Sequence, residues 1–91
     1  FSISFLVIGK NVTITEKLTT QQLNYLKALI AGEKAISSTD VMHRYKISST
    51  TSIARSKAAL IKNDILDNNA GEISFQDPIY AYWLKTEYFA K

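Results

Sequence analysis

Residue types that carry out acid–base or metal chemistry are sparse in this 91-residue sequence. It contains one histidine, His43, and no cysteine. A zinc site draws on several His, Cys or carboxylate ligands at suitable spacing, and a nucleophilic triad needs a histidine with Ser and Asp partners. No such set is suggested around His43, which we expect to be a surface or partly buried helix residue. We therefore predict no catalytic residues, no metal ligands and no cofactor-binding residues in this chain.

The pair Gly9-Lys10 does not fit the phosphate-binding P-loop motif. That loop needs another Gly five residues before the Gly-Lys pair and a Ser or Thr directly after it. Ser4 and Asn11 occupy these two positions, so both requirements fail. The carboxylates Asp64, Asp67, Glu72 and Asp77 are typical of caps, turns and solvated positions. We therefore expect the chain not to be an enzyme.

A stretch of basic residues without acids is the main feature of the charge pattern. The net charge is only +3, but residues 41–63 hold five of the eleven Lys and Arg residues. These are Arg44, Lys46, Arg55, Lys57 and Lys62. A local basic stripe can favour phosphate backbones, and it can equally be a solvated helix face. Both interpretations stay open on charge alone.

Apolar residues three and four positions apart predict an amphipathic helix that ends before Gly32. Its cap is Thr19 or Thr20. The apolar positions are Leu23, Leu26, Leu29 and Ile30, with Tyr25 alongside.

A short second helix and a longer third helix follow. Ser38 or Thr39 caps the second helix, and residues 45–48 make a tight connection in which Ile47 must be buried. The apolar residues of the second helix are Val41, Met42 and Tyr45. The third helix covers residues 49–63, and its expected buried stripe is Ile53, Leu60 and Ile61, helped by Ala54 and Ala59.

The last third of the chain predicts a hairpin and a closing helix. Residues 65–67 form a strand, 68–71 a turn and 72–75 the return strand, with Ile73 and Phe75 on one face. Asp77-Pro78 then begins a helix, with Asp as cap and Pro in the first turn. Its apolar face is Ile79, Trp83 and Leu84, surrounded by Tyr80, Tyr82, Tyr88 and Phe89.

The N-terminal segment is ambiguous. Residues 1–5 and 12–15 alternate between apolar and polar, and residues 9–11 can turn the chain, so the local pattern favours a hairpin. Phe1, Phe5 and Ile8 would also share one face of a helix. We treat residues 1–17 as an N-terminal extension and residues 18–91 as the main domain.

The order of elements predicts the fold class. A short helix, a tight turn and a longer helix with a polar N-terminal face form the helix-turn-helix pattern. The hairpin directly after it occupies the position of a wing. The prediction is a mainly α fold with a small β-hairpin, a winged helix-turn-helix.

Three segments also resemble a known family. They are residues 18–28 (LTTQQLNYLKA), residues 57–60 leading to 64–67 (KAAL, DILD), and residues 73–80 (ISFQDPIY) followed by Trp83-Leu84. In this order they resemble the C-terminal winged-helix domain of prokaryotic P-loop ATPases of the AAA/STAND type, common in Bacteroides-like bacteria and related to archaeal ATPases. The resemblance implies an ATP-binding module ahead of this domain in a bacterial parent protein. It also favours a helix near residues 1–15, and it is broken at Ser56, where the family tends to be apolar.

Two functions are expected from these patterns. The first is a non-catalytic regulatory or protein-interaction module, whose partner is the ATP-binding module of the parent chain and whose candidate interface is Tyr82, Tyr88 and Phe89. Phe89 can instead close the core around Trp83. The alternative is binding of double-stranded DNA through the helix 49–63, with candidate contacts Arg44, Lys46, Thr50, Thr51, Ser52, Arg55, Lys57 and Lys62.

The expected setting is the cytoplasm. The longest apolar run, residues 5–8, is far shorter than the roughly 20 residues that span a bilayer. The start lacks the basic region of a signal peptide. Since residue 1 is Phe, we expect the chain to be a piece of a longer protein. Its oligomeric state is left open.

Overall fold

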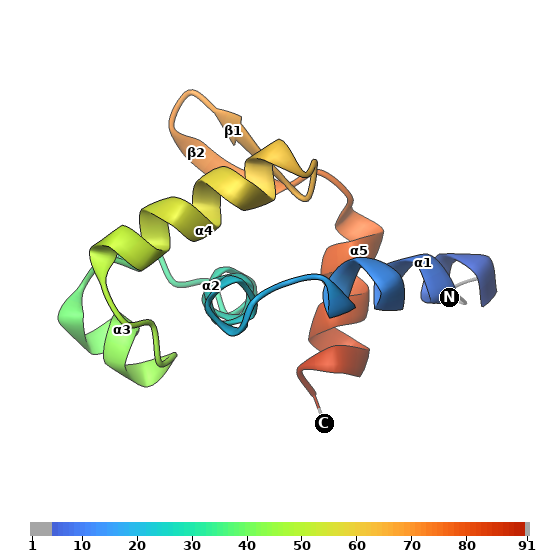
Figure 1. Ribbon diagram of the computed structural model, residues 1–91, viewed down its shortest axis with the longest axis horizontal. Coiled ribbons are helices and arrows are strands. Elements are labelled where there is room, and N and C mark those ends of the chain that lie inside the picture. The colour runs from blue at the N-terminus through green and yellow to red at the C-terminus, as the bar shows by residue number, and fades with distance from the viewer. Residues whose placement is uncertain (1–4, 91) are drawn as a thin grey trace.

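The computed structural model describes residues 5–90 and, within them, the side chains of residues 9–90. Six helical segments and one antiparallel hairpin make up this part of the chain, which is the mainly α fold with a small β-hairpin that the sequence predicts (Figure 1). The elements are α1 (Phe5–Glu16), α2 (Thr20–Ile30), α3 (Thr39–Arg44), α4 (Thr50–Lys62), β1 (Leu66–Asn69), β2 (Glu72–Phe75), α5 (Pro78–Trp83) and the π-helical turn η1 (Leu84–Tyr88).

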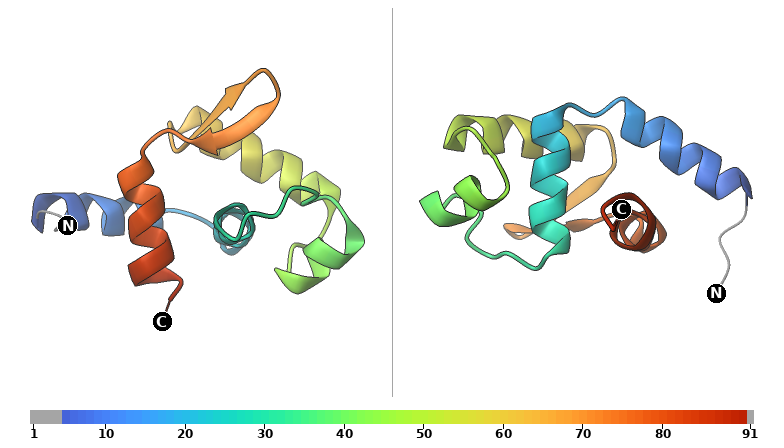
Figure 2. Two further views of the ribbon diagram at one scale, coloured as in Figure 1. Left: turned by 180° about the vertical axis from the view of Figure 1, so that it is seen from behind. Right: turned by 90° about the horizontal axis from the view of Figure 1, so that it is seen from below.

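Helices α2 and α4 pack against each other at the centre, and the hairpin lies along α4 (Figure 1). Helix α5 and η1 form one continuous rod that runs beside α2 and crosswise to it (Figure 1 and Figure 2). In both further views α1 extends outward beyond this rod, at one end of the molecule (Figure 2).

The N-terminal segment is a helix, so the hairpin favoured by its alternating pattern is wrong. The expected turn at residues 9–11 lies in the middle of α1, and the first strand residues, 1–4, lie outside the described residues. Threonine, a good strand former, is accommodated here because its hydroxyl bonds one turn back: Thr13 to the Gly9 carbonyl (2.9 Å) and Thr15 to the Asn11 carbonyl (2.7 Å).

A buried tyrosine ties α1 to α5. The Tyr80 hydroxyl donates to Thr15 Oγ1 at 2.8 Å, since the Thr15 hydrogen is already given to the Asn11 carbonyl. Thr15 and Tyr80 are 2% and 4% exposed. Asn11 is also buried, and its Nδ2 has no partner among the described residues. The buried hydrogen bond between Thr15 and Tyr80 therefore holds α1 against α5.

The helix starts are those that the sequence predicts. Thr19 caps α2 in a capping box with Gln22, and Ser38, Ser49 and Asp77 accept from backbone amides at the starts of α3, α4 and α5. Each cap satisfies an amide that has no partner within its helix.

Three helices end on residues with positive φ. These are Gly32 (84°), Lys46 (57°) and Asp64 (60°). At the second and third, the next residue donates back across the helix end: Ile47 to the Met42 carbonyl (2.8 Å) and Ile65 to the Leu60 carbonyl (2.9 Å). Both isoleucines are buried. The expected burial of Ile47 in the tight connection is thus confirmed.

The core gathers apolar side chains from every element between α2 and η1. Leu26, Leu60, Leu66 and Leu84 are fully buried, and each is worth about 1.5–3 kcal/mol by transfer from water. The remaining buried apolar residues are Tyr25, Ala28, Ile36, Val41, Ile47, Ile65, Tyr80 and Trp83.

Two predicted core positions are wrong. Ile79 is 42% exposed and Tyr80 takes the buried place, because Tyr80 bonds to Thr15 on α1 and its ring packs on Phe75 and Trp83. In α4, Ala54 is exposed and Ser56 is buried, since the inward row runs through residues 56 and 60. The polar residue that departs from the resembling family therefore lies inside.

The hairpin lies one residue later than predicted at its first strand. Leu66 pairs with Phe75 and Asn69 with Glu72, so the turn is Ala70-Gly71 rather than residues 68–71. Both turn residues have positive φ, 55° and 88°, which is the type I′ turn of two-residue hairpins. Ile73 and Phe75 share the half-buried face, as predicted.

Ala70 is expected to be a destabilising choice at this turn. Ala70→Gly removes the Cβ that, at positive φ, lies too close to the backbone carbonyl oxygen. The substitution should raise the free energy of unfolding by up to about 1 kcal/mol in a urea titration. The matched control, Ala58→Gly, is exposed inside α4 and should lower it by about 0.5–1 kcal/mol. A loss of stability at both positions would contradict the turn assignment.

Stability is expected to fall at alkaline pH. Burial raises the pKa of the Tyr25 and Tyr80 hydroxyls above the ordinary value of about 10. The unfolded chain therefore loses these protons first, so stability is constant below about pH 9 and declines above about pH 10. Urea titrations across this range check the decline, which should be smaller in Tyr25→Phe. An equal decline in that variant would contradict the assignment.

Candidate nucleic-acid and protein interfaces

Two amides on α2 hold the turn between α3 and α4. Gln21 Nε2 and Asn24 Nδ2 both donate to the Lys46 carbonyl, each at 3.2 Å. Gln21 Oε1 accepts from the Ser48 amide and from Ser52 Oγ, each at 3.0 Å. We call these hydrogen bonds the turn clamp. They connect α2 to the turn and to the first turn of α4, so they set the direction in which α4 leaves the turn.

Sequence reasoning missed the turn clamp. Gln21 and Asn24 were not singled out, because polar residues on an amphipathic helix are ordinarily solvated. Their spacing of three, which places them on one side of α2, was the available signal. The acceptor of the Asn24 amide is a backbone carbonyl 22 residues away, and a backbone group cannot be recognised from the residue types in the sequence.

The outer face of α4 carries part of the predicted DNA-contact set. Thr50, Thr51, Arg55 and Lys62 are exposed and make no hydrogen bond or ion pair with the described residues. Small residues, Ala54 and Ala58 among them, separate them. Helix α4 itself matches the predicted span, with Ser49 and Asn63 as its caps.

The other predicted DNA contacts lie elsewhere or are already engaged. Ser52 is half-buried in the turn clamp, and Lys57 is half-buried facing the hairpin side of α4, so the structure places neither on the outer face. Arg44 donates to Glu33 Oε2 at 2.7 Å in an ion pair. Lys46 is exposed next to the turn. The basic stripe of the sequence is thus divided over several faces.

The hairpin offers polar but not basic groups. Asn68 Oδ1 accepts from the Gly71 amide, and Asn69 Nδ2 donates to Asp67 Oδ2 at 3.3 Å. Asp67 in β1 and Glu72, directly after the turn, add carboxylates. Such a hairpin has no cation for a phosphate group.

Comparison with known families decides the fold family. Residues 11–86 match the model of a family described as "Probable winged helix domain". The chain belongs to this family. No curated protein and no solved structure matches it. In winged helix terms, α4 is the recognition helix and the β1–β2 hairpin is the wing.

A continuous series of aromatic rings runs from the wing of the winged helix domain to its C-terminal end. Phe75 meets Tyr80 edge-on at 6.4 Å between ring centroids, and Tyr80 stacks on Trp83 at 6.1 Å. Tyr88 lies 5.8 Å from Trp83, and Phe89 contacts Tyr88 edge-on at 5.2 Å. These rings make α5 and η1 a stiff edge of the domain.

Most of the exposed large apolar side chains lie on this same rod. Among residues 9–90 they are Val12 on α1 and Ile79, Tyr82 and Tyr88 on α5 and η1, and Tyr82 is 50% exposed. Phe89, the third predicted interface residue, is half-buried against the core, so it follows the alternative in which it closes the core. We call Ile79, Tyr82 and Tyr88 the aromatic edge.

The described residues bring together no group of three or more His, Cys, Asp or Glu side chains that could hold a metal ion. The helices in this part of the chain are also too short or too polar to cross a lipid bilayer.

The turn clamp gives a testable prediction. Gln21→Ala removes the acceptor of the Ser48 amide and of Ser52 Oγ and should destabilise the domain by about 0.5–1.5 kcal/mol. Hydrogen exchange at the Ser48 amide should become faster. Thr20→Ala, exposed in the same turn of α2, is the matched control and should change stability by less than about 0.5 kcal/mol. Unchanged Ser48 exchange in Gln21→Ala would show that the clamp does not hold the turn.

Proposed function

We propose that this winged helix domain is a non-catalytic protein-interaction module that docks through its aromatic edge. The observation that carries the proposal is the position of the exposed Ile79, Tyr82 and Tyr88, which lie on α5 and η1 and not on the recognition helix. In line with the sequence resemblance, the proposed partner is the ATP-binding module of a bacterial, cytoplasmic parent ATPase, whose state the domain would help to regulate.

The chemistry of the aromatic edge supports a protein partner. Exposed tyrosines bury a large apolar area at low cost in side-chain entropy, and their hydroxyls keep a hydrogen-bonding end. Lys85 and Glu87 are exposed beside them on η1 and supply charged groups of both signs for a polar rim. The ring contacts of Tyr88 with Trp83 and Phe89 restrict the Tyr88 side chain before binding, which reduces the ordering cost of association.

The recognition helix gives weaker support to DNA binding. Affinity for a duplex comes mainly from several cations that neutralise phosphates. Around the outer face of α4 the exposed cations without an ion pair in the described residues are Lys46, Arg55 and Lys62, and the wing adds carboxylates. The protein-interaction function therefore accounts for more of the exposed surface.

The double variant Ile79→Ser/Tyr82→Ser tests the docking proposal. Both side chains are exposed, so folding should be retained, whereas Tyr88 is left intact because it packs on Trp83. Binding of the 91-residue chain to the separately produced ATP-binding module, measured by calorimetry, should weaken by about tenfold or more. ATP turnover of the joined protein should change in parallel.

The control is Thr51→Ala/Arg55→Ala on the recognition helix, which should bind the ATP-binding module normally. If this control weakens the complex and the α5 variant does not, docking by the aromatic edge is wrong. A parent protein without any ATP-binding module would refute the proposed partner.

DNA binding remains the second candidate because Thr50, Thr51 and Arg55 are exposed and unpaired on the recognition helix. If it operates, the chain binds random duplex at low salt, and Arg55→Ala weakens binding by about 1–3 kcal/mol at a contacted guanine. Fluorescence anisotropy measures this. Our principal proposal predicts no binding of the duplex at low salt, and salt-dependent binding lost in Arg55→Ala would favour the DNA function instead.

A further inference from the structure

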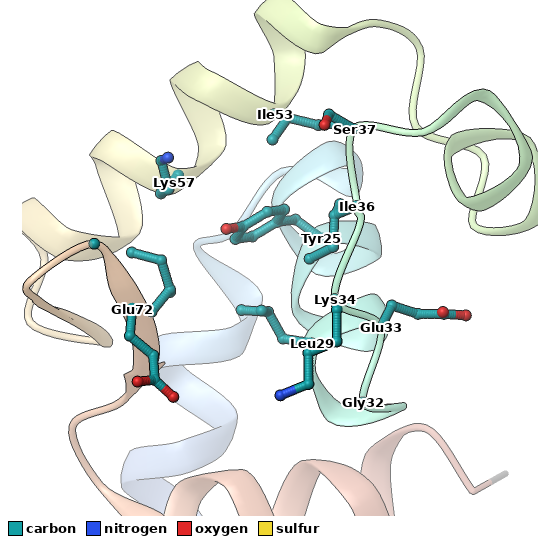
Figure 3. A pocket seen from close by; sticks show the side chains of 12 residues that line it. Tyr25, Leu29, Gly32, Glu33, Lys34, Ile36, Ser37, Ile53, Lys57 and Glu72 are labelled. Carbon is teal, nitrogen blue, oxygen red and sulfur yellow. The ribbon is translucent and has the colours of Figure 1, made fainter.

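A cavity of about 470 Å³ opens on a face that neither proposed interface uses. It lies between α2, the loop of residues 32–37, α4 and the wing (Figure 3). Aliphatic side chains from all four segments line it: Leu29, Ile36, Ile53 and Ile73. Its volume lies within the range of small-molecule sites, which are mostly apolar with a few placed polar groups.

The Tyr25 hydroxyl is the polar group at the centre of this cavity. Tyr25 is 3% exposed, and its hydroxyl points away from α2 into the gap (Figure 3). It makes no hydrogen bond to any described residue. The hydroxyl faces the open cavity, so it can donate its hydrogen to a ligand that accepts it there. Desolvation raises the pKa of Tyr25, which keeps it protonated as a donor.

The charges around the cavity leave one cation without a counterpart. Glu33 is paired with Arg44 and points away from the gap. Beside that pair, the lining carries two cations, Lys34 and Lys57, and one carboxylate, Glu72. The Lys34 ammonium and the Glu72 carboxylate lie at the same end of the gap (Figure 3). Lys57, half-buried on α4, remains on the side to which the Tyr25 hydroxyl points. An ammonium and a hydroxyl donor together suit a carboxylate.

We propose that this cavity binds a small aliphatic carboxylate, with its chain on the four aliphatic residues and its carboxylate at Lys57 and Tyr25. Four segments of the chain surround the gap, a shape that suits a compact ligand better than a polypeptide. Since one wall is the wing and another the recognition helix, occupancy would fix the wing relative to α4. The inference does not depend on the docking function, because the aromatic edge contributes no residue to the cavity.

Sodium octanoate, kept below its micelle-forming concentration, is the probe. Titration of the isotope-labelled 91-residue chain should shift the backbone amides of Ile36, Ile53 and Ile73 in a saturable way. Octylamine, which has the same chain length and the opposite charge, should bind at least about tenfold more weakly than octanoate. Lys57→Met and Tyr25→Phe keep the side-chain size and should each weaken octanoate binding by about tenfold.

Lys62→Met is the matched control, since it removes a cation from the same helix outside the cavity. It should bind octanoate as the unmodified chain does, and the dispersed spectrum of each variant checks its folding. Three results would overturn the proposal: no saturable shift, equal binding of octanoate and octylamine, or shifts confined to α5 and η1. Equal weakening by Lys57→Met and Lys62→Met would do the same.

Discussion

The position of the recognition helix depends on a few hydrogen bonds from α2 to the turn before it. Gln21 and Asn24 both donate to the Lys46 carbonyl. Gln21 Oε1 also accepts hydrogen bonds from the Ser48 amide and the Ser52 hydroxyl. This arrangement uses the positive φ of Lys46, which ends α3 and sends Ile47 into the core. The six-residue helix α3 is held by the burial of Val41 and by the Arg44–Glu33 ion pair, and the clamp fixes the turn that follows it. The wing and the C-terminal rod are then placed on the surface that α2 and α4 create.

The sequence predicts the central part of the fold well because its signals are local. Caps at Thr19, Ser38, Ser49 and Asp77 mark helix starts, and apolar spacing marks their buried sides. The prediction is wrong where long-range packing decides. Alternation in residues 1–15 favours strands, yet residues 5–16 form a helix whose buried Thr15 meets Tyr80, 65 positions later. Ile79 and Tyr80 exchange their expected places for a similar reason.

The candidate sites show the same division between local and long-range information. Thr50, Thr51, Arg55 and Lys62 lie on the outer face of α4 because helical spacing alone sets that face. Ser52 and Lys57 were grouped with them, but their neighbours on α2 and on the wing give them other surroundings. The unpaired hydroxyl of Tyr25 was not foreseeable, since Tyr25 was expected only as an apolar neighbour of the α2 stripe. Its meaning depends on residues from three other segments.

A winged helix has several surfaces, and in this chain they differ in chemistry. The recognition helix presents threonines and few cations, the wing presents asparagines and carboxylates, and the α5–η1 rod presents exposed aromatic rings on a stiff base. Charge therefore argues against phosphate as the main partner, and apolar exposure argues for protein. The +3 net charge alone would not separate these alternatives.

Hydrogen–deuterium exchange of the parent protein, compared with that of the isolated 91-residue chain, tests this account most directly. Docking through the aromatic edge predicts slower exchange in residues 78–89 of the parent protein and unchanged exchange in residues 50–62. Slower exchange in residues 50–62 with no change in residues 78–89 would contradict it.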